Sequence, residues 1–164
     1  MGVIVMNINL LKEIYEDNKK IDHEFIDKYS SDNKLHQKNC IGFLVELGEF
    51  INETKVFKYW SVKEPDKSKV LEEYADVITS LLMFFNINNV NLEIIEHKDY
   101  EIFELLNYIY YLGTKLINKE KVEKELLSNI LYLSNLLNIE EKDIYNSIKK
   151  KQKIVLDRLN DESY

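Results

Sequence analysis

Proline and glycine are scarce in this chain, with one proline and four glycines among 164 residues. A β-sandwich or barrel needs many tight turns, so this scarcity disfavours both architectures. Cys40 is the only cysteine, which excludes an intrachain disulfide and favours a reducing compartment such as the cytoplasm. No apolar run reaches the roughly 18 residues that a membrane-spanning helix needs. The opening MGVIVM is too short for a signal peptide.

Basic residues are outnumbered by acidic ones, 22 against 29, which gives a formal net charge of -7. A general nucleic-acid binder would show a basic face, so this balance disfavours one. The chain is 45% apolar and 31% charged, which is enough to bury a core. We therefore expect one cytoplasmic domain, residues 1–164, that binds neither nucleic acid nor a membrane.

The apolar residues recur with a helical period through nearly the whole chain. No internal repeat or low-complexity linker interrupts this pattern. The expected fold class is all-α, a single-domain bundle of about six helices. The pattern predicts these helices at residues 8–29, 38–56, 67–86, 100–117, 121–136 and 142–159.

The stretch VELGEFINE places three carboxylates along one side of an otherwise apolar helix. On a helical wheel of about 100° per residue, Glu46, Glu49 and Glu53 fall within a sector of roughly 60°. Such a stripe is often only a solvated face, and six other pairs in the chain share the E-x-x-E or E-x-x-D spacing. The stripe alone therefore does not indicate a site.

The segment VLEEYADVITSLLMFF carries a second acidic pair in a more apolar setting. Glu73 and Asp76 are three residues apart and share a face. A helix that is apolar nearly all round is usually buried, and a bare carboxylate there would cost several kcal/mol or take up a proton. A bound cation would keep Asp76 charged. A basic partner such as Lys69 is the alternative.

A loop of about ten residues separates the two segments, which suits antiparallel neighbours. Four carboxylates can then converge from facing helices: Glu46, Glu49, Glu73 and Asp76. Oxygen ligands without nitrogen or sulfur suit Mg²⁺, with Mn²⁺ as the alternative. A di-iron site would want Glu-x-x-His, a spacing that none of the three histidines has: His23, His36 and His97. The residues alone leave a metal site and a structural salt-bridge network as equal alternatives.

The segment VELGEFINETKVFKYWSVK, followed by LEEYADVITSLL, resembles the dimeric all-α dUTPases. These belong to a wider group of all-α nucleoside triphosphate pyrophosphatases that includes MazG. The resemblance is strong from Phe43 to Leu82 and weaker toward both ends. It implies an all-α fold, a homodimer, and hydrolysis of a nucleoside triphosphate, dUTP in the first place, to the monophosphate and pyrophosphate.

The resemblance also implies roles for the carboxylates. Those at Glu46, Glu49, Glu73 and Asp76 match the family's Mg²⁺ ligands. The metal clamps the triphosphate while a water molecule attacks a phosphorus atom. Glu46 or Glu49 takes the proton of that water as the catalytic base. Glu53 matches a family glutamate that supports the ligands from behind.

Further positions match residues that bind the substrate in the family. Lysines and an aromatic ring in FKYWSVK line the nucleotide site: Lys58, Trp60 and Lys63. Asn18 and Asp22, on one face of the first helix, match a pair that contacts the base. In KQKIVLDRL, Lys151 and Arg158 match a lysine and an arginine, and Tyr164 matches a terminal tyrosine. Each of these has a plainer reading as a surface charge, a solvated face or a core aromatic.

Three positions depart from the family pattern. Thr79 stands where dUTPases often have a histidine, Val155 where an asparagine is expected, and Val77 where there is a glycine. The sequence therefore supports the pyrophosphatase chemistry better than the choice of base, and dCTP, dTTP or a modified nucleotide stays an alternative substrate. Two other readings are a regulatory protein that binds a protein partner and a plain structural bundle.

Overall fold

The structure is a computed structural model that describes residues 6–96 and 98–161. Its regular elements in these ranges are all helices, six in number, so the expected all-α class is confirmed. Their bounds are α1 Ile8–Tyr29, α2 Leu35–Thr54, α3 Lys67–Ile87, α4 Ile102–Ile117, α5 Glu123–Leu136 and α6 Glu141–Leu159. The predicted bounds differ from these by three residues at most. Within the described ranges, no helix is both long and apolar enough to cross a membrane.

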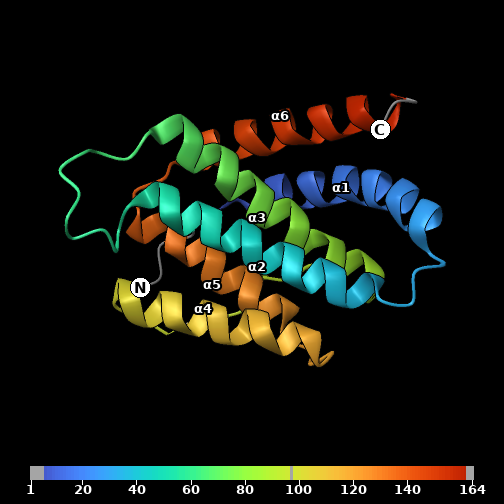
Figure 1. Ribbon diagram of the computed structural model, residues 1–164, viewed down its shortest axis with the longest axis horizontal. Helices are drawn as coiled ribbons and strands as arrows, with labels where there is room; N and C mark the ends of the chain where they lie inside the picture. Colours follow the sequence, from blue (N-terminus) through green and yellow to red (C-terminus); the bar gives the residue numbers. More distant parts are fainter. Residues whose placement is uncertain (1–5, 97, 162–164) are drawn as a thin grey trace.

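Short polar side chains set where helices begin. Asp66 caps α3 by accepting hydrogen bonds from the backbone amides of Ser68 at 3.0 Å and Lys69 at 3.4 Å. Asn7 caps α1 in the same way through the amide of Asn9. Beyond its last residue, α2 ends on Lys55 in the left-handed region, with φ of 55°. The end of α2 and the beginning of α3 set the bounds of the segment 55–66. This segment joins the two helices and extends past the end of the bundle (Figure 1).

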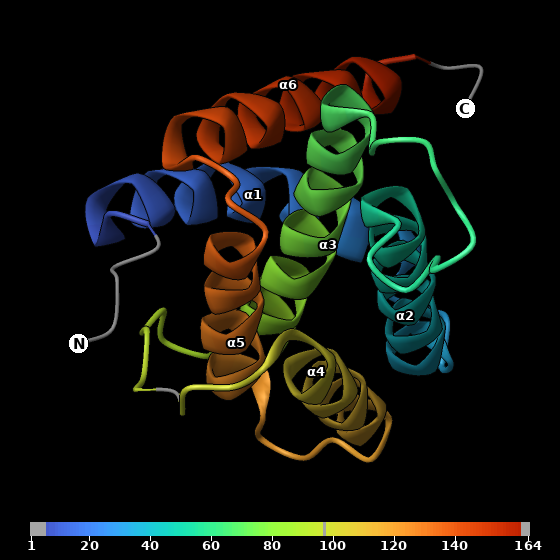
Figure 2. The ribbon, with the colours of Figure 1, turned by 90° about the vertical axis from the view of Figure 1, so that its left-hand side faces the viewer.

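Helix α3 lies at the centre of the bundle, in contact with α1, α2, α5 and α6 (Figures 1 and 2). Its apolar residues occupy several faces because neighbours cover it on several sides. Tyr74 is fully buried, packs edge-on against Phe50 and donates a hydrogen bond to the carbonyl of Ile130 at 3.1 Å. Helix α4 packs against α2 and α5 on the side away from α6. The packing thus holds α2 and α3, which carry the acidic pairs, side by side.

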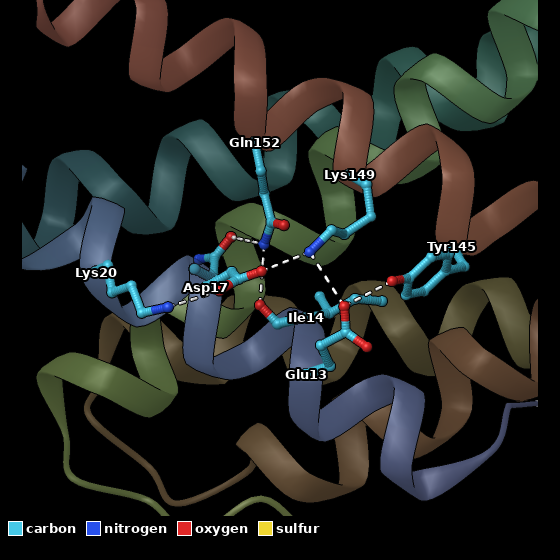
Figure 3. Close-up of polar contacts among 8 residues, drawn as sticks. Glu13, Ile14, Asp17, Lys20, Tyr145, Lys149 and Gln152 are labelled. Carbon is cyan, nitrogen blue, oxygen red and sulfur yellow. Dashed lines mark hydrogen bonds and ion pairs between the residues drawn. The ribbon is translucent and has the colours of Figure 1, made fainter.

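Helix α6 lies along α1 and joins it through polar contacts (Figure 3). Lys149 bridges Glu13 and Asp17, and the Tyr145 hydroxyl donates to Glu13 at 2.6 Å. These contacts are partly exposed, so each contributes little to stability. Deeper in the same contact, the Gln152 amide donates to the carbonyl of Ile14 at 2.9 Å. This docking places one face of α6 opposite α3.

Candidate active site

Three of the predicted carboxylates form a cluster between α2 and α3. One oxygen each of Glu46, Glu49 and Glu73 lies within 4.8 Å of the other two. Glu46 and Glu73 are partly buried and Glu49 is exposed. We call these three residues the acidic cluster. Its oxygen-only donor set fits a hard divalent cation such as Mg²⁺. Neither His23 nor His36 belongs to it, and His97 lies outside the described residues.

Burial and the charges of neighbouring acids both act on Glu46 and Glu73. The pKa of Glu46 is raised by desolvation and then by the charges of Asp76 and Glu49. The pKa of Glu73 is raised by desolvation and by its acidic neighbours Asp76, Glu49 and Glu46. Both shifts mean that the protein alone disfavours the charged forms. A cation among these oxygens would reverse that preference.

Asp76 stands beside the acidic cluster and meets a cation of the chain itself. Lys151 Nζ on α6 lies 2.5 Å from Asp76 Oδ1. Desolvation raises the pKa of Asp76, while Lys151 acts in the opposite direction. The basic partner of this carboxylate therefore comes from α6, and the alternative raised from the sequence, Lys69, is exposed.

A cleft of about 200 Å³ opens next to the acidic cluster, between α1, α2, α3 and α6. Glu46, Asp76 and Lys151 line one part of it, together with the predicted base contacts Asn18 and Asp22. Apolar and weakly polar side chains complete its wall: Ile21, Phe25, Thr79, Ser80, Met83, Gln152 and Val155. Residues from four helices thus meet around one hollow that joins acidic, basic and apolar surfaces.

A chain of side-chain amides crosses this cleft wall. Asn18 Nδ2 donates to Asp22 Oδ2 at 2.8 Å and to the Thr79 carbonyl at 3.2 Å. Asn86, from the end of α3, donates to the same Asp22 oxygen. Gln152 Nε2 donates to Asn18 Oδ1 at 3.4 Å. Asn18, Asp22 and Gln152 are each more than nine-tenths buried. The i, i+4 pair predicted from the sequence is therefore part of a longer buried network.

Other predicted substrate residues lie away from the cleft. Trp60 is 62% exposed and packs edge-on against Phe57 and Tyr59. Lys58 and Lys63 lie in the same 55–66 segment, and neither lines the cleft. On the far side of Lys151, a second groove between α3 and α6 is lined by Arg158. Glu53 is partly buried, with its neighbour Asn52 donating to it at 3.4 Å, and Tyr164 lies outside the described residues.

Sequence reasoning missed Gln152 and Asn86 as members of the cleft network. Gln152 follows the predicted substrate contact Lys151, but in the sequence it is one polar residue among many in a charged helix. Asn86 lies in the Asn-rich end of α3 and reads as the start of a loop. Their partners are 134 and 64 residues away, so no local pattern signals them.

A family model described as dUTPase matches residues 10–164. The match covers α1 from Leu10 onward and the whole of α2 to α6, and it includes every residue of the acidic cluster and of the cleft wall. A search of curated proteins found no match.

Asp22 provides a test of the buried network. Burial raises its pKa from 3.8 to about 6, against the lowering effect of the hydrogen bonds from Asn86 and Asn18. Because the folded-state pKa is the higher one, its contribution to stability is complete below pH 3.8 and is lost as the pH rises through about 6. Asp22→Asn, which keeps an acceptor for both amides, should be more stable than the parent by about 1–3 kcal/mol at pH 7.

This difference should shrink toward pH 4, where Asp22 is protonated. Urea unfolding of both proteins in EDTA at several pH values measures it, and the other titrating groups cancel in the comparison. An Asp22→Asn protein that is less stable than the parent at pH 7 would contradict this prediction. It would show that the hydrogen bonds to Asp22 outweigh the cost of burying its charge.

Proposed function

This chain belongs to the dUTPase family, and from that premise we propose that it converts dUTP and water to dUMP and pyrophosphate in the cleft beside the acidic cluster. The observation that carries the proposal is the meeting of Glu46, Glu49 and Glu73 at the edge of a hollow. That hollow has a volume of about 200 Å³ and is lined on one side by buried amides. A plain structural bundle would have no need to crowd three acids there.

The acidic cluster would hold Mg²⁺, or Mn²⁺ in its place, with Asp76 as a further ligand. When bound, the metal supplies positive charge to the triphosphate and makes water easier to deprotonate. Glu46 or Glu49 takes the proton of the attacking water. Lys151 is paired with Asp76, and a divalent cation at that carboxylate would leave its ammonium group to contact a phosphate oxygen. Glu53 supports the cluster from the next turn of α2.

The helix register gives the substrate a direction. Both Glu49 on α2 and Glu73 on α3 lie nearer to the 55–66 segment than Glu46 and Asp76 do, because that segment joins these two helices (Figure 1). Thr79 and the rest of the cleft follow on α3 in the opposite direction. We therefore place the base in the cleft and the triphosphate across the acidic cluster toward the 55–66 segment.

This direction gives the exposed residues of the 55–66 segment a role. Lys58 and Lys63 add positive charge at the end where the pyrophosphate leaves, and Trp60 covers the nucleotide when the segment closes over it. Arg158 would contribute charge from α6. We propose these as substrate contacts made in the bound state, in one domain formed by all six helices and working in the cytoplasm.

An apolar face shared by α2 and α4 supports a homodimer. Ile41 and Val45 on α2 are 54% and 52% exposed, at i, i+4 spacing. Tyr110 of α4 lies beside this stripe, its hydroxyl 3.6 Å from the position a Cβ on Gly48 would take. Further exposed apolar residues extend the face along α4: Phe103, Tyr111 and Ile117. A second copy would cover this α2–α4 face. If a different protein covered the α2–α4 face instead, this chain would have a regulatory role.

Hydrolysis of dUTP should depend on both a divalent ion and the acidic cluster. We expect pyrophosphate release from dUTP with Mg²⁺ and none with EDTA. Glu49→Gln should lower kcat by about 10² or more, because it removes a ligand or the base. Glu24→Gln, an exposed carboxylate of α1, is the control and should keep full activity.

The same assay separates the roles of Glu46 and Glu49. Loss of the base lowers kcat at every Mg²⁺ concentration, whereas loss of a ligand raises the Mg²⁺ concentration needed for half-maximal rate. Absence of pyrophosphate from every nucleotide triphosphate, with or without metal, would refute the proposed function.

Metal binding should also be visible in stability without any turnover. A ligand that binds only the folded state stabilises it by about 2.7 kcal/mol at a concentration of 100 Kd. We expect Mg²⁺ to raise Tm in the parent and to have no effect in Glu73→Gln, with Ca²⁺-free buffer and a potassium salt as the ionic-strength control. An identical response of both proteins would remove the acidic cluster as the metal site.

The homodimer is tested by charging the α2–α4 face. Sedimentation velocity should give the parent twice the 19.6 kDa mass of one chain. Ile41→Arg should give a monomer, because a buried unpaired charge opposes association. Ile8→Arg, at an apolar position of α1 that is 37% exposed, should remain dimeric. A parent that sediments as a monomer at micromolar concentration would contradict the homodimer.

A further inference from the structure

Among the described residues that line the cleft, Lys151 is the basic one. Its Nζ lies 2.5 Å from Asp76 Oδ1, and the two side chains are 25% and 12% exposed. The same ammonium group also lowers the pKa of Glu46, against the larger effects that raise it. Within the described part of the chain, neither Glu46 nor Glu73 has an ion pair of its own. Lys151 thus brings positive charge to a site that is otherwise acidic.

The side chain of Lys151 has room to leave Asp76 while α6 stays in place. It lines both the cleft and the groove of about 270 Å³ between α3 and α6, so open space lies on two sides of it. Its neighbours hold the helix on α1, since Lys149 pairs with acids of α1 and the Gln152 amide donates to the carbonyl of Ile14 at 2.9 Å. A change of partner at Lys151 therefore needs only rotation about its flexible stem.

A ligand bound to one half of this ion pair uncovers the charge of the other half. A divalent cation at Asp76 would leave the ammonium group of Lys151 unpaired beside a second positive charge. An anion that took Lys151 alone would leave Asp76 partly buried and bare, near the like charges of Glu46 and Glu49. With both ligands present every charge has an opposite partner, so each ligand removes a cost that the other would meet.

We propose that Lys151 is an internal counter-ion that occupies Asp76 until a nucleotide triphosphate takes its ammonium group, which makes the divalent cation and the triphosphate bind cooperatively. Asp76 is then fully available to the metal only when a nucleotide is present. This inference rests on the proposed function, from which it takes the metal site and the triphosphate. It adds that the two ligands bind more tightly together than apart, and couplings of this kind commonly change an affinity about 5- to 150-fold.

The first measurement is the affinity of the nucleotide-free protein for Mn²⁺, with the free ion counted by electron paramagnetic resonance at pH 8. Lys151→Met removes the charge and keeps an apolar stem, and should tighten Mn²⁺ binding about tenfold because Asp76 loses its competing partner. A lysine that only contacts phosphate would not affect this number. Lys151→Arg keeps the charge and should retain the affinity of the parent.

Lys153→Met is the matched control for this measurement. It removes the same charge from an exposed position two residues further along α6. Because exposed charges away from the site are screened, it should change the Mn²⁺ affinity by less than about twofold.

The second measurement is the affinity for a non-hydrolysable dUTP analogue with an imido group between the α- and β-phosphates, at saturating Mn²⁺, by isothermal titration calorimetry. Lys151→Met should weaken this binding about tenfold, because it removes a charge-assisted contact with phosphate. One substitution then shifts the affinities for two ligands in opposite directions. A merely structural role for Lys151 would not produce that pattern, and Lys153→Met should show neither shift.

The outcomes separate this inference from the proposed function. Mn²⁺ binding that is unchanged or weaker in Lys151→Met overturns the inference, and so does tighter Mn²⁺ binding without loss of affinity for the analogue. If the parent hydrolyses dUTP in either case, the proposed function still stands. Both opposite shifts in a parent that hydrolyses no dUTP would overturn the proposed function alone, and a parent that binds neither ligand overturns both. Should Lys151→Met unfold, Lys151→Gln replaces it in both measurements.

Discussion

Repulsion among the carboxylates of α2 and α3 is the electrostatic cost that the packing of this molecule has to overcome. The charged forms of Glu46 and Glu73 are disfavoured by burial and by the acidic side chains around them, Glu49 among these, at the edge of a partly desolvated cleft. The arrangement is tolerable because the central helix α3 packs on several sides and holds its partners in place. Energy released by core packing thus offsets an electrostatic cost that a divalent cation is suited to remove.

Periodicity and end signals were enough to predict the helices. The apolar period of 3.6 residues located all six, and the Asn and Asp caps explain why α1 and α3 begin where they do. The largest error, at the start of α2, falls where Lys34 offers no side-chain cap and the polar stretch around it disguises three helical residues. The short loop and antiparallel packing were enough to predict that Glu46, Glu49 and Glu73 approach one another, whereas Asp76 lies beside them in an ion pair with Lys151.

The inner wall of the cleft could not be predicted in the same way. Gln152 and Asn86 acquire their importance from partners on other helices, and the sequence spacing of those partners carries no period. The identity of a polar residue does not show whether it is solvated or buried. Likewise, Lys58, Trp60 and Lys63 were predicted as substrate contacts only through a family resemblance, and none of them lines the cleft.

The acidic cluster and the part of the cleft wall that α6 supplies come from different helices. The acids come from α2 and α3, whereas Gln152 and Val155 come from α6, which touches only α1 and α3 among its principal neighbours. A substitution at Gln152 or Val155 therefore changes the wall of the cleft without touching the packing of α2 on α3 that brings the acidic cluster together. The shape and polarity of the hollow can thus vary through one face of the last helix, independently of the acids beside it.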